Sequence, residues 1–133
     1  MVQLASIRVL LVDDDRDTRE ALVALLQAYG AEVTQAESAR DGIAAYVRFK
    51  PSIVVSDLNM PHSDGCALMR EIRAVDQRFG MSTPGLAITG WSRVYGRNHA
   101  MEAGFNEYLT KPLDPSVLVE TIQLLLGRPS ACA

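Results

Sequence analysis

Three consecutive carboxylates follow a short apolar segment near the start of the chain. Asp13, Asp14 and Asp15 come directly after residues 7–12, and Asp57 ends a second apolar segment further along. Neighbouring like charges repel each other: at about 5 Å and an effective dielectric constant near 20, two unit charges repel by roughly 3 kcal/mol. The acidic side chains must therefore either separate into water or share a cation.

Two other polar residues hold equivalent positions. Thr89 ends the apolar segment 86–89, and Lys111 follows the predicted strand 105–110. A carboxylate can attack phosphorus and form an aspartyl phosphate, Mg²⁺ prefers carboxylate, carbonyl and water oxygens, and an ammonium group binds phosphoryl oxygens as a point charge. If folding brings these groups together with Asp57, the set favours phosphoryl transfer, which depends mainly on positioning and electrostatic stabilisation.

The segments around these polar residues predict the elements that would position them. Short apolar runs rich in branched residues alternate with runs whose apolar residues recur at helical spacing. Strands that alternate with helices form a parallel sheet covered on both faces, and such sheets bind ligands outside the carboxyl ends of their strands. The predicted strands are 7–12, 32–36, 53–57, 86–89 and 105–110, and the predicted helices are 18–29, 38–49, 65–79, 93–103 and 115–126.

Polar residues at three predicted helix starts are typical N-caps. Ser38 precedes the second helix in a variant of the capping box, and Asp114 precedes the last helix. Asp15 is expected to cap the first helix rather than to bind a metal ion. Residues 58–64 are expected to form a loop.

The composition of the 133-residue chain is typical of a soluble globular protein, with 48% hydrophobic and 22% charged residues. We expect one domain over residues 1–127 and a disordered tail over 128–133. The net charge of −3 without a basic run argues against direct contact with nucleic acid, and no apolar run is long enough to span a bilayer. Cys66 and Cys132 are expected to be free thiols, and no signal peptide is recognisable, so the expected location is the cytoplasm.

Taken in order, the motifs at the predicted strand ends resemble those of receiver domains of two-component response regulators, the chemotaxis-regulator-like family. The resemblance covers about residues 7–126. It implies a flavodoxin-like, doubly wound α/β fold with a five-stranded parallel sheet in the order 2-1-3-4-5. The motifs are Leu11-Val12-Asp13-Asp14-Asp15, Ser56-Asp57-Leu58-Asn59-Met60-Pro61 with Asp64-Gly65, Ala87-Ile88-Thr89-Gly90 and Tyr108-Leu109-Thr110-Lys111-Pro112-Leu113.

The resemblance also implies an acceptor and a metal site. Asp57 would be the phospho-acceptor and would share a Mg²⁺ ion with Asp13 and Asp14. Asp14 would ligate the ion directly, and Asp13 would do so mainly through water. Asn59 would offer its backbone carbonyl to the same ion.

Three more residues carry implied roles in the phosphoryl response. Thr89 and Lys111 would contact the phosphoryl group, and Tyr108 matches the switch aromatic, which turns inward when the threonine moves. The peptide bond between Lys111 and Pro112 is expected to be cis, as in similar proteins.

The partners implied by the resemblance are a sensor histidine kinase or a histidine phosphotransfer protein as donor and a downstream protein that the sequence does not name. The face built by the fourth helix, the fifth strand and the fifth helix would shift on phosphorylation and could form a homodimer. No enzymatic turnover is expected beyond self-phosphotransfer and self-dephosphorylation. Whether the chain acts alone or belongs to a hybrid kinase or larger regulator stays open.

Two rival functions are considered beside this one. The first is a receiver-fold binding module that works without phosphate. The second is a phosphatase of the haloacid dehalogenase class, which needs Asp-x-Asp-x-Thr after the first strand, but Asp17 stands where that motif requires threonine. A flavodoxin is disfavoured, because three acids after the first strand would repel the flavin phosphate. Trp91 is a further hypothesis: its ring would overhang the acidic pocket and limit water.

Overall fold

Five parallel strands form the central sheet of the computed structural model, which describes residues 3–60, 63–90 and 93–127. The strand order is β2-β1-β3-β6-β7, and each neighbouring pair is parallel. This is the order 2-1-3-4-5 of the five sheet strands, and it confirms the expected doubly wound, flavodoxin-like α/β fold. The strands are β1 (Arg8–Val12), β2 (Glu32–Ala36), β3 (Ile53–Asp57), β6 (Gly85–Thr89) and β7 (Glu107–Thr110).

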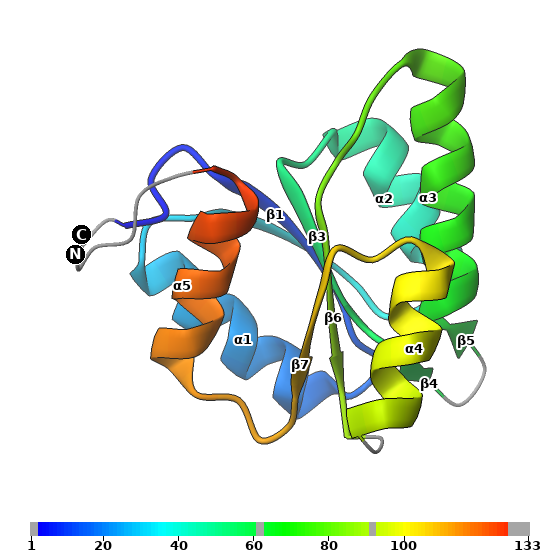
Figure 1. Cartoon of the computed structure of the whole chain (residues 1–133). Coiled ribbons are helices and arrows are strands. Elements are labelled where there is room, and N and C mark those ends of the chain that lie inside the picture. Colours follow the sequence, from blue (N-terminus) through cyan, green and yellow to red (C-terminus); the bar gives the residue numbers. More distant parts are fainter. Residues whose placement is uncertain (1–2, 61–62, 91–92, 128–133) are drawn as a thin grey trace.

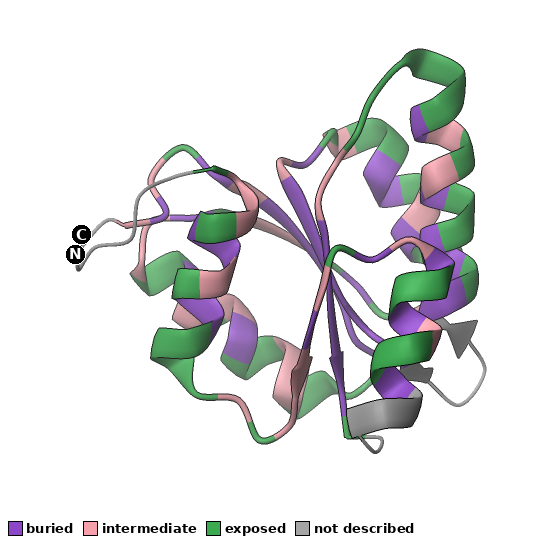
Figure 2. Cartoon of the chain, viewed as in Figure 1, coloured by how far each residue is buried: buried purple, intermediate pink, exposed green. Residues whose placement is uncertain are grey.

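Helices cover both faces of this sheet (Figure 1). Helices α1 and α5 lie on one face and α2, α3 and α4 on the other, and each face has its own cluster of buried apolar residues. Figure 2 shows the buried positions along the strands and on the helix sides that face them. The helices are α1 (Arg16–Ala28), α2 (Ala39–Phe49), α3 (Gly65–Phe79), α4 (Arg93–Ala103) and α5 (Pro115–Leu125).

The predicted helix caps are confirmed. The Asp15 carboxylate accepts hydrogen bonds from the Thr18 backbone N–H at 2.9 Å and from its hydroxyl at 2.5 Å. These two bonds lower the pKa of the Asp15 carboxyl. Ser38 caps α2 and Asp114 caps α5 in the same way. The Asp15 carboxylate is therefore engaged in capping α1, as predicted.

The structure differs from the predicted elements at a few places. The predicted loop 58–64 contains two short antiparallel strands, β4 (Asn59–Met60) and β5 (Ser63–Asp64). The last strand begins at Glu107 rather than at residue 105, because the Phe105 N–H bonds to the Ala100 carbonyl at the end of α4. Trp91 and the predicted tail 128–133 lie outside the described residues.

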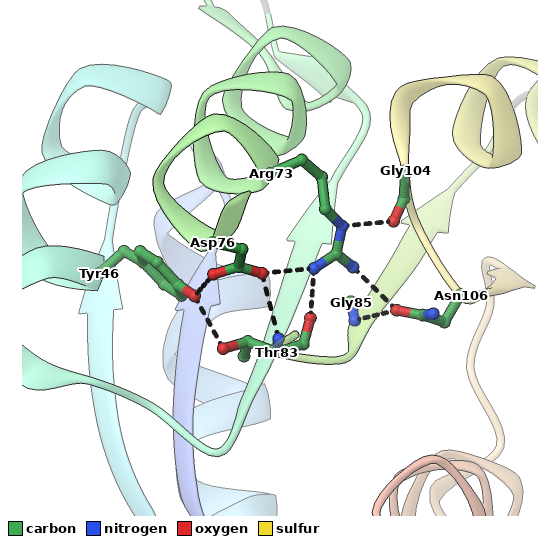
Figure 3. A network of polar contacts seen from close by, with 7 residues as sticks. All are labelled: Tyr46, Arg73, Asp76, Thr83, Gly85, Gly104 and Asn106. Carbon is green, nitrogen blue, oxygen red and sulfur yellow. Dashed lines mark hydrogen bonds and ion pairs between the residues drawn. The ribbon is translucent and has the colours of Figure 1, made fainter. Parts of the chain in front are cut away.

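A partly buried polar network joins α3 to the loops that precede β6 and β7 (Figure 3). Its centre is Arg73 of α3, whose guanidinium donates to Asp76 at 2.8 Å and to the Thr83 carbonyl at 2.6 Å. The same group donates to the Gly104 carbonyl and to the Asn106 side chain, both at 2.9 Å. The network thus joins α3 to the loops before β6 and β7, at the end of the sheet opposite to Asp13 and Asp57.

Tyr46 extends this network to α2. Its hydroxyl donates to the Asp76 carboxylate and lies 2.7 Å from the Thr83 hydroxyl. Asp76 is only 3% exposed, so its charge depends on Arg73, Tyr46 and the Thr83 N–H for compensation.

None of the helices within residues 3–60, 63–90 and 93–127 combines the length and the apolar character that crossing a membrane requires.

Candidate functional site

The acidic residues meet where the central strands end. Strands β1 and β3 are neighbours in the sheet, and Val12 lies opposite Ser56. Asp13 and Asp57 are the next residues along each strand, so both lie at the same end of the sheet. One carboxylate oxygen of each of Asp13, Asp14 and Asp57 lies within 4.8 Å of the others. The structure therefore brings together the three acids that the sequence singled out.

Local hydrogen bonds fix the backbone of Asp13 beside this cluster. Its N–H donates to the Ala36 carbonyl of β2 at 3.1 Å, and its own carbonyl accepts from the Arg19 guanidinium at 2.9 Å. Its carboxylate accepts from the Asp15 N–H at 2.9 Å. Asp13 is 2% exposed and Asp57 6%, whereas Asp14 is more open to solvent. Two of the three carboxyl groups are therefore withdrawn from water, which favours a cation beside them.

Lys111 supplies one positive charge to the cluster. Its ammonium nitrogen lies 3.4 Å from an Asp13 oxygen and 3.5 Å from an Asp57 oxygen. Burial by itself lowers the pKa of Lys111, but the attraction of Asp57 and Asp13 and their hydrogen bonds outweigh it, so the pKa is raised. The side chain therefore stays protonated at neutral pH and leaves the three carboxylates with a net charge of about −2.

The remaining charge fits a hard divalent cation. The three grouped ligands are all carboxylates, with no histidine or thiolate among the described residues of the group. All-oxygen ligand sets of this kind suit Mg²⁺ or Ca²⁺ rather than softer metals. The acidic pocket can therefore hold a magnesium ion.

Thr89 and Tyr108 come from the next two strands. Thr89 ends β6 and is fully buried, and its carbonyl accepts from the Lys111 N–H at 2.9 Å. Tyr108 on β7 is 7% exposed and lies opposite Ala87. The Lys111–Pro112 peptide bond is cis, as expected. Thr89 and Lys111 thus lie at the same end of the sheet as the acids, whereas Tyr108 lies two residues before the end of β7.

Two residues near the site received no role from the sequence alone. A Cβ on Gly65, the first residue of α3, would lie 2.2 Å from the Asp57 carbonyl oxygen, so the helix can start this close to the acid only with glycine. Arg19 also bonds to Gln35 of β2 at 2.9 Å while it holds the Asp13 carbonyl. The Asp64-Gly65 motif in the sequence indicated that Gly65 matters, whereas no local sequence pattern marks Arg19.

The predicted ligand Asn59 lies in β4, directly after Leu58.

The sheet order and this cluster define a flavodoxin-like α/β protein with three carboxylates grouped at the switch point. The model of the response regulator receiver domain matches residues 9–123, most of the chain. The chain belongs to the family of response regulator receiver domains, which are signalling domains of two-component systems. This membership overturns the haloacid dehalogenase and flavodoxin alternatives.

Named relatives agree with the family. The chain is 40% identical over 123 residues to an uncharacterized 14.6 kDa protein of Leptolyngbya boryana, with 92% of each chain covered. It is 34% identical over 130 residues to the transcriptional regulatory protein PrrA of Mycobacterium leprae, covering 98% of this chain but 54% of PrrA. Among solved structures, the chemotaxis protein CheY4 of Vibrio cholerae matches with a TM-score of 0.83 and 29% identity, over 91% of this chain and 99% of that one. The chain therefore spans about half the length of PrrA.

Proposed function

We propose that this chain is the phospho-accepting receiver domain of a two-component phosphorelay, with Asp57 as the acceptor. The observation that carries the proposal is the cluster of Asp13, Asp14 and Asp57 with Lys111 between two of them. A buried carboxylate beside a cation and a metal-binding acid pair is what in-line phosphoryl transfer to aspartate requires.

The metal would be held by Asp13, Asp14 and Asp57 together with the backbone carbonyl of Asn59. When bound, Mg²⁺ neutralises charge on the oxygens of the phosphoryl group. Carboxylates alone would repel an incoming phosphate, so the site accepts one only with its cations in place.

The chain's own residues then carry the transfer. An oxygen of the Asp57 carboxylate attacks phosphorus, the new P–O bond forms as the P–N bond of the donor phosphohistidine breaks, and the imidazole leaves with the electron pair of that bond. The Lys111 ammonium, already 3.5 Å from Asp57, stabilises a phosphoryl oxygen. The hydroxyl of Thr89, at the end of the neighbouring strand, donates to another.

The output would be a shift in the face built by α4, β7 and α5. The phosphoryl dianion draws Thr89 and Lys111 toward it, and Tyr108 follows inward. A local charge thereby biases an equilibrium between two arrangements of that face. The partner that binds this face is a downstream protein or a second phosphorylated copy of this chain.

Several features of the proposal concern context. The donor is a sensor histidine kinase or a histidine phosphotransfer protein in the cytoplasm, and the chain performs no turnover beyond gaining and losing its own phosphoryl group. The proposed receiver domain spans residues 1–127. These points rest on family membership and on the residues of the acidic pocket.

Intact-mass measurement after incubation with acetyl phosphate and Mg²⁺ tests the acceptor. We expect the wild type to gain the mass of one phosphoryl group and Asp57→Ala to gain none, while Asp15→Ala is labelled like the wild type. Chelating the metal should abolish labelling. A wild-type protein that stays unlabelled under conditions that label another receiver would refute the proposal and favour a phosphate-independent binding module.

A further inference from the structure

Gly96 is a helix-interior residue whose presence is costly to α4. It is the fourth of the eleven residues of α4 (Arg93–Ala103), and a glycine within a helix disfavours the helix by about fivefold in equilibrium constant relative to alanine. The helix needs good helix formers, because it has the weakest apolar pattern of the five described helices. We therefore expect neighbouring atoms to leave no room for a side chain at position 96.

The contacts around Gly96 give that explanation. A Cβ atom built there would lie 2.9 Å from Cε2 and 3.0 Å from the hydroxyl oxygen of Tyr108, and 3.1 Å from the methyl carbon of Thr89. Favourable contacts between carbon atoms begin at about 3.5 Å, so an added methyl group would overlap both residues. Gly96, Tyr108 and Thr89 are all buried, which leaves little free space for adjustment.

The two residues that crowd Gly96 come from different strands. Thr89 ends β6, and Tyr108 lies on β7, its neighbour in the sheet. Gly96 is therefore the point where α4 touches both of them at once. Gly90 provides a contrast, since a Cβ built on it meets no atom within 4 Å among the described residues outside its own chain neighbours.

We propose that Gly96 is a positioning residue for Thr89 and Tyr108: its missing side chain keeps open the buried space in which the Tyr108 hydroxyl end and the Thr89 methyl group meet beneath α4. A methyl group at position 96 forces the outer end of the Tyr108 ring and the Thr89 methyl group to shift. An effect of Gly96 on phosphoryl transfer rests on the function proposed above for Thr89. The contacts of Gly96 with Tyr108 and Thr89 do not depend on that function.

A double-mutant cycle in the unphosphorylated protein tests the packing. The four proteins are the wild type, Gly96→Ala, Tyr108→Ala and the double variant, and the readout is the unfolding equilibrium in urea. We expect Gly96→Ala to leave the folding constant unchanged or to lower it in the wild type, and to raise it about fivefold once Tyr108 is truncated. Asn98→Ala, at an exposed position of α4, should have the same effect in both backgrounds. Equal effects of Gly96→Ala in the two backgrounds would show that position 96 and Tyr108 are not coupled, which would contradict the proposal.

Labelling of Asp57 by acetyl phosphate and Mg²⁺ tests the consequence. We expect Gly96→Ala to slow labelling at least threefold relative to the wild type, and the double variant to be labelled no more slowly than Tyr108→Ala. Asn98→Ala should match the wild type. A coupled unfolding cycle with unchanged labelling would overturn the positioning role. An unlabelled wild type would instead refute the proposed function, and the unfolding cycle would still decide the packing.

Discussion

At the scale of single residues, the site is governed by charge balance. Three carboxylates carry about −3, Lys111 returns one positive charge, and a divalent cation would cancel the rest. Asp15 continues the acidic run in the sequence, but its carboxylate is engaged by Thr18 at the start of α1. Neighbouring residues of one type therefore have different surroundings: Asp13 and Asp14 face Asp57, whereas Asp15 caps α1.

Gly65 tests how tightly the backbone of Asp57 is placed. A Cβ at this position would meet the Asp57 carbonyl oxygen at 2.2 Å and the Leu58 Cα at 3.0 Å, and backbone atoms cannot rotate away. We expect Gly65→Ala to lower the free energy of unfolding by about 1–3 kcal/mol and to slow labelling of Asp57. Urea unfolding and intact-mass kinetics would measure the two effects.

The matched control is Gly90→Ala, where a Cβ would contact none of the described residues apart from the chain neighbours of Gly90. Its unfolding free energy should stay within about 0.5 kcal/mol of the wild type. If both alanine variants behaved alike, the close approach of α3 to Asp57 would not matter to the site.

At the scale of elements, the network around Arg73 holds α2, α3 and the loop after α4 together, away from the acids (Figure 3). Its side chains reach across from separate elements, so no periodicity or short motif predicts it. It anchors the end of α4 at the Gly104 carbonyl, while the proposed response concerns the other end of that helix, near Thr89.

Arg73→Met tests this anchor. The substitution keeps much of the apolar stem but leaves the buried Asp76 carboxylate without its charged partner. We expect a loss of roughly 3 kcal/mol in the free energy of unfolding, at the low end for buried ion pairs because the Arg73 side chain is 26% exposed. Arg70→Met, at an exposed position of the same helix, should change it by less than about 0.5 kcal/mol. Equal losses in urea unfolding would show that the network adds little.

The same network predicts a dependence on alkaline pH. Burial, with the hydrogen bond to Asp76, raises the pKa of Tyr46 to about 12. An unfolded chain loses this proton near pH 10. The contribution of Tyr46 is therefore complete below pH 10 and is lost as the pH rises toward 12.

We expect the melting temperature of the wild type to fall more steeply between pH 10 and 12 than that of Tyr46→Phe. Comparing the slopes removes the constant cost of losing the hydroxyl. Parallel curves for the two proteins would contradict the raised pKa.

At the scale of the whole molecule, the sheet and the acidic edge could be predicted because both follow from the order of elements. Parallel strands that end in Asp13, Asp57 and Thr89 must present these residues at one edge, whatever the details of the loops. The sheet order itself followed from the family resemblance rather than from the apolar pattern.

The parts that could not be predicted depend on contacts between distant segments. The short hairpin of β4 and β5 has too few residues to show a pattern, and the start of β7 depends on the Phe105 N–H closing the end of α4. The proposed role of Gly96 cannot be predicted from sequence, because it depends on contacts with the distant residue Tyr108. In sequence, a glycine in a helical segment indicates only a lower helix propensity.

The central claim is that acids from two separate segments share one divalent cation beside Asp57. Calorimetric titration with Mg²⁺ tests it most directly, on the wild type and on Asp14→Asn, Asp57→Asn and Asp15→Asn. We predict one ion per chain, at least tenfold weaker binding in the first two variants, and wild-type affinity in Asp15→Asn, because Asp15 caps α1. No saturable binding to the wild type, or equal weakening by all three substitutions, would contradict the account.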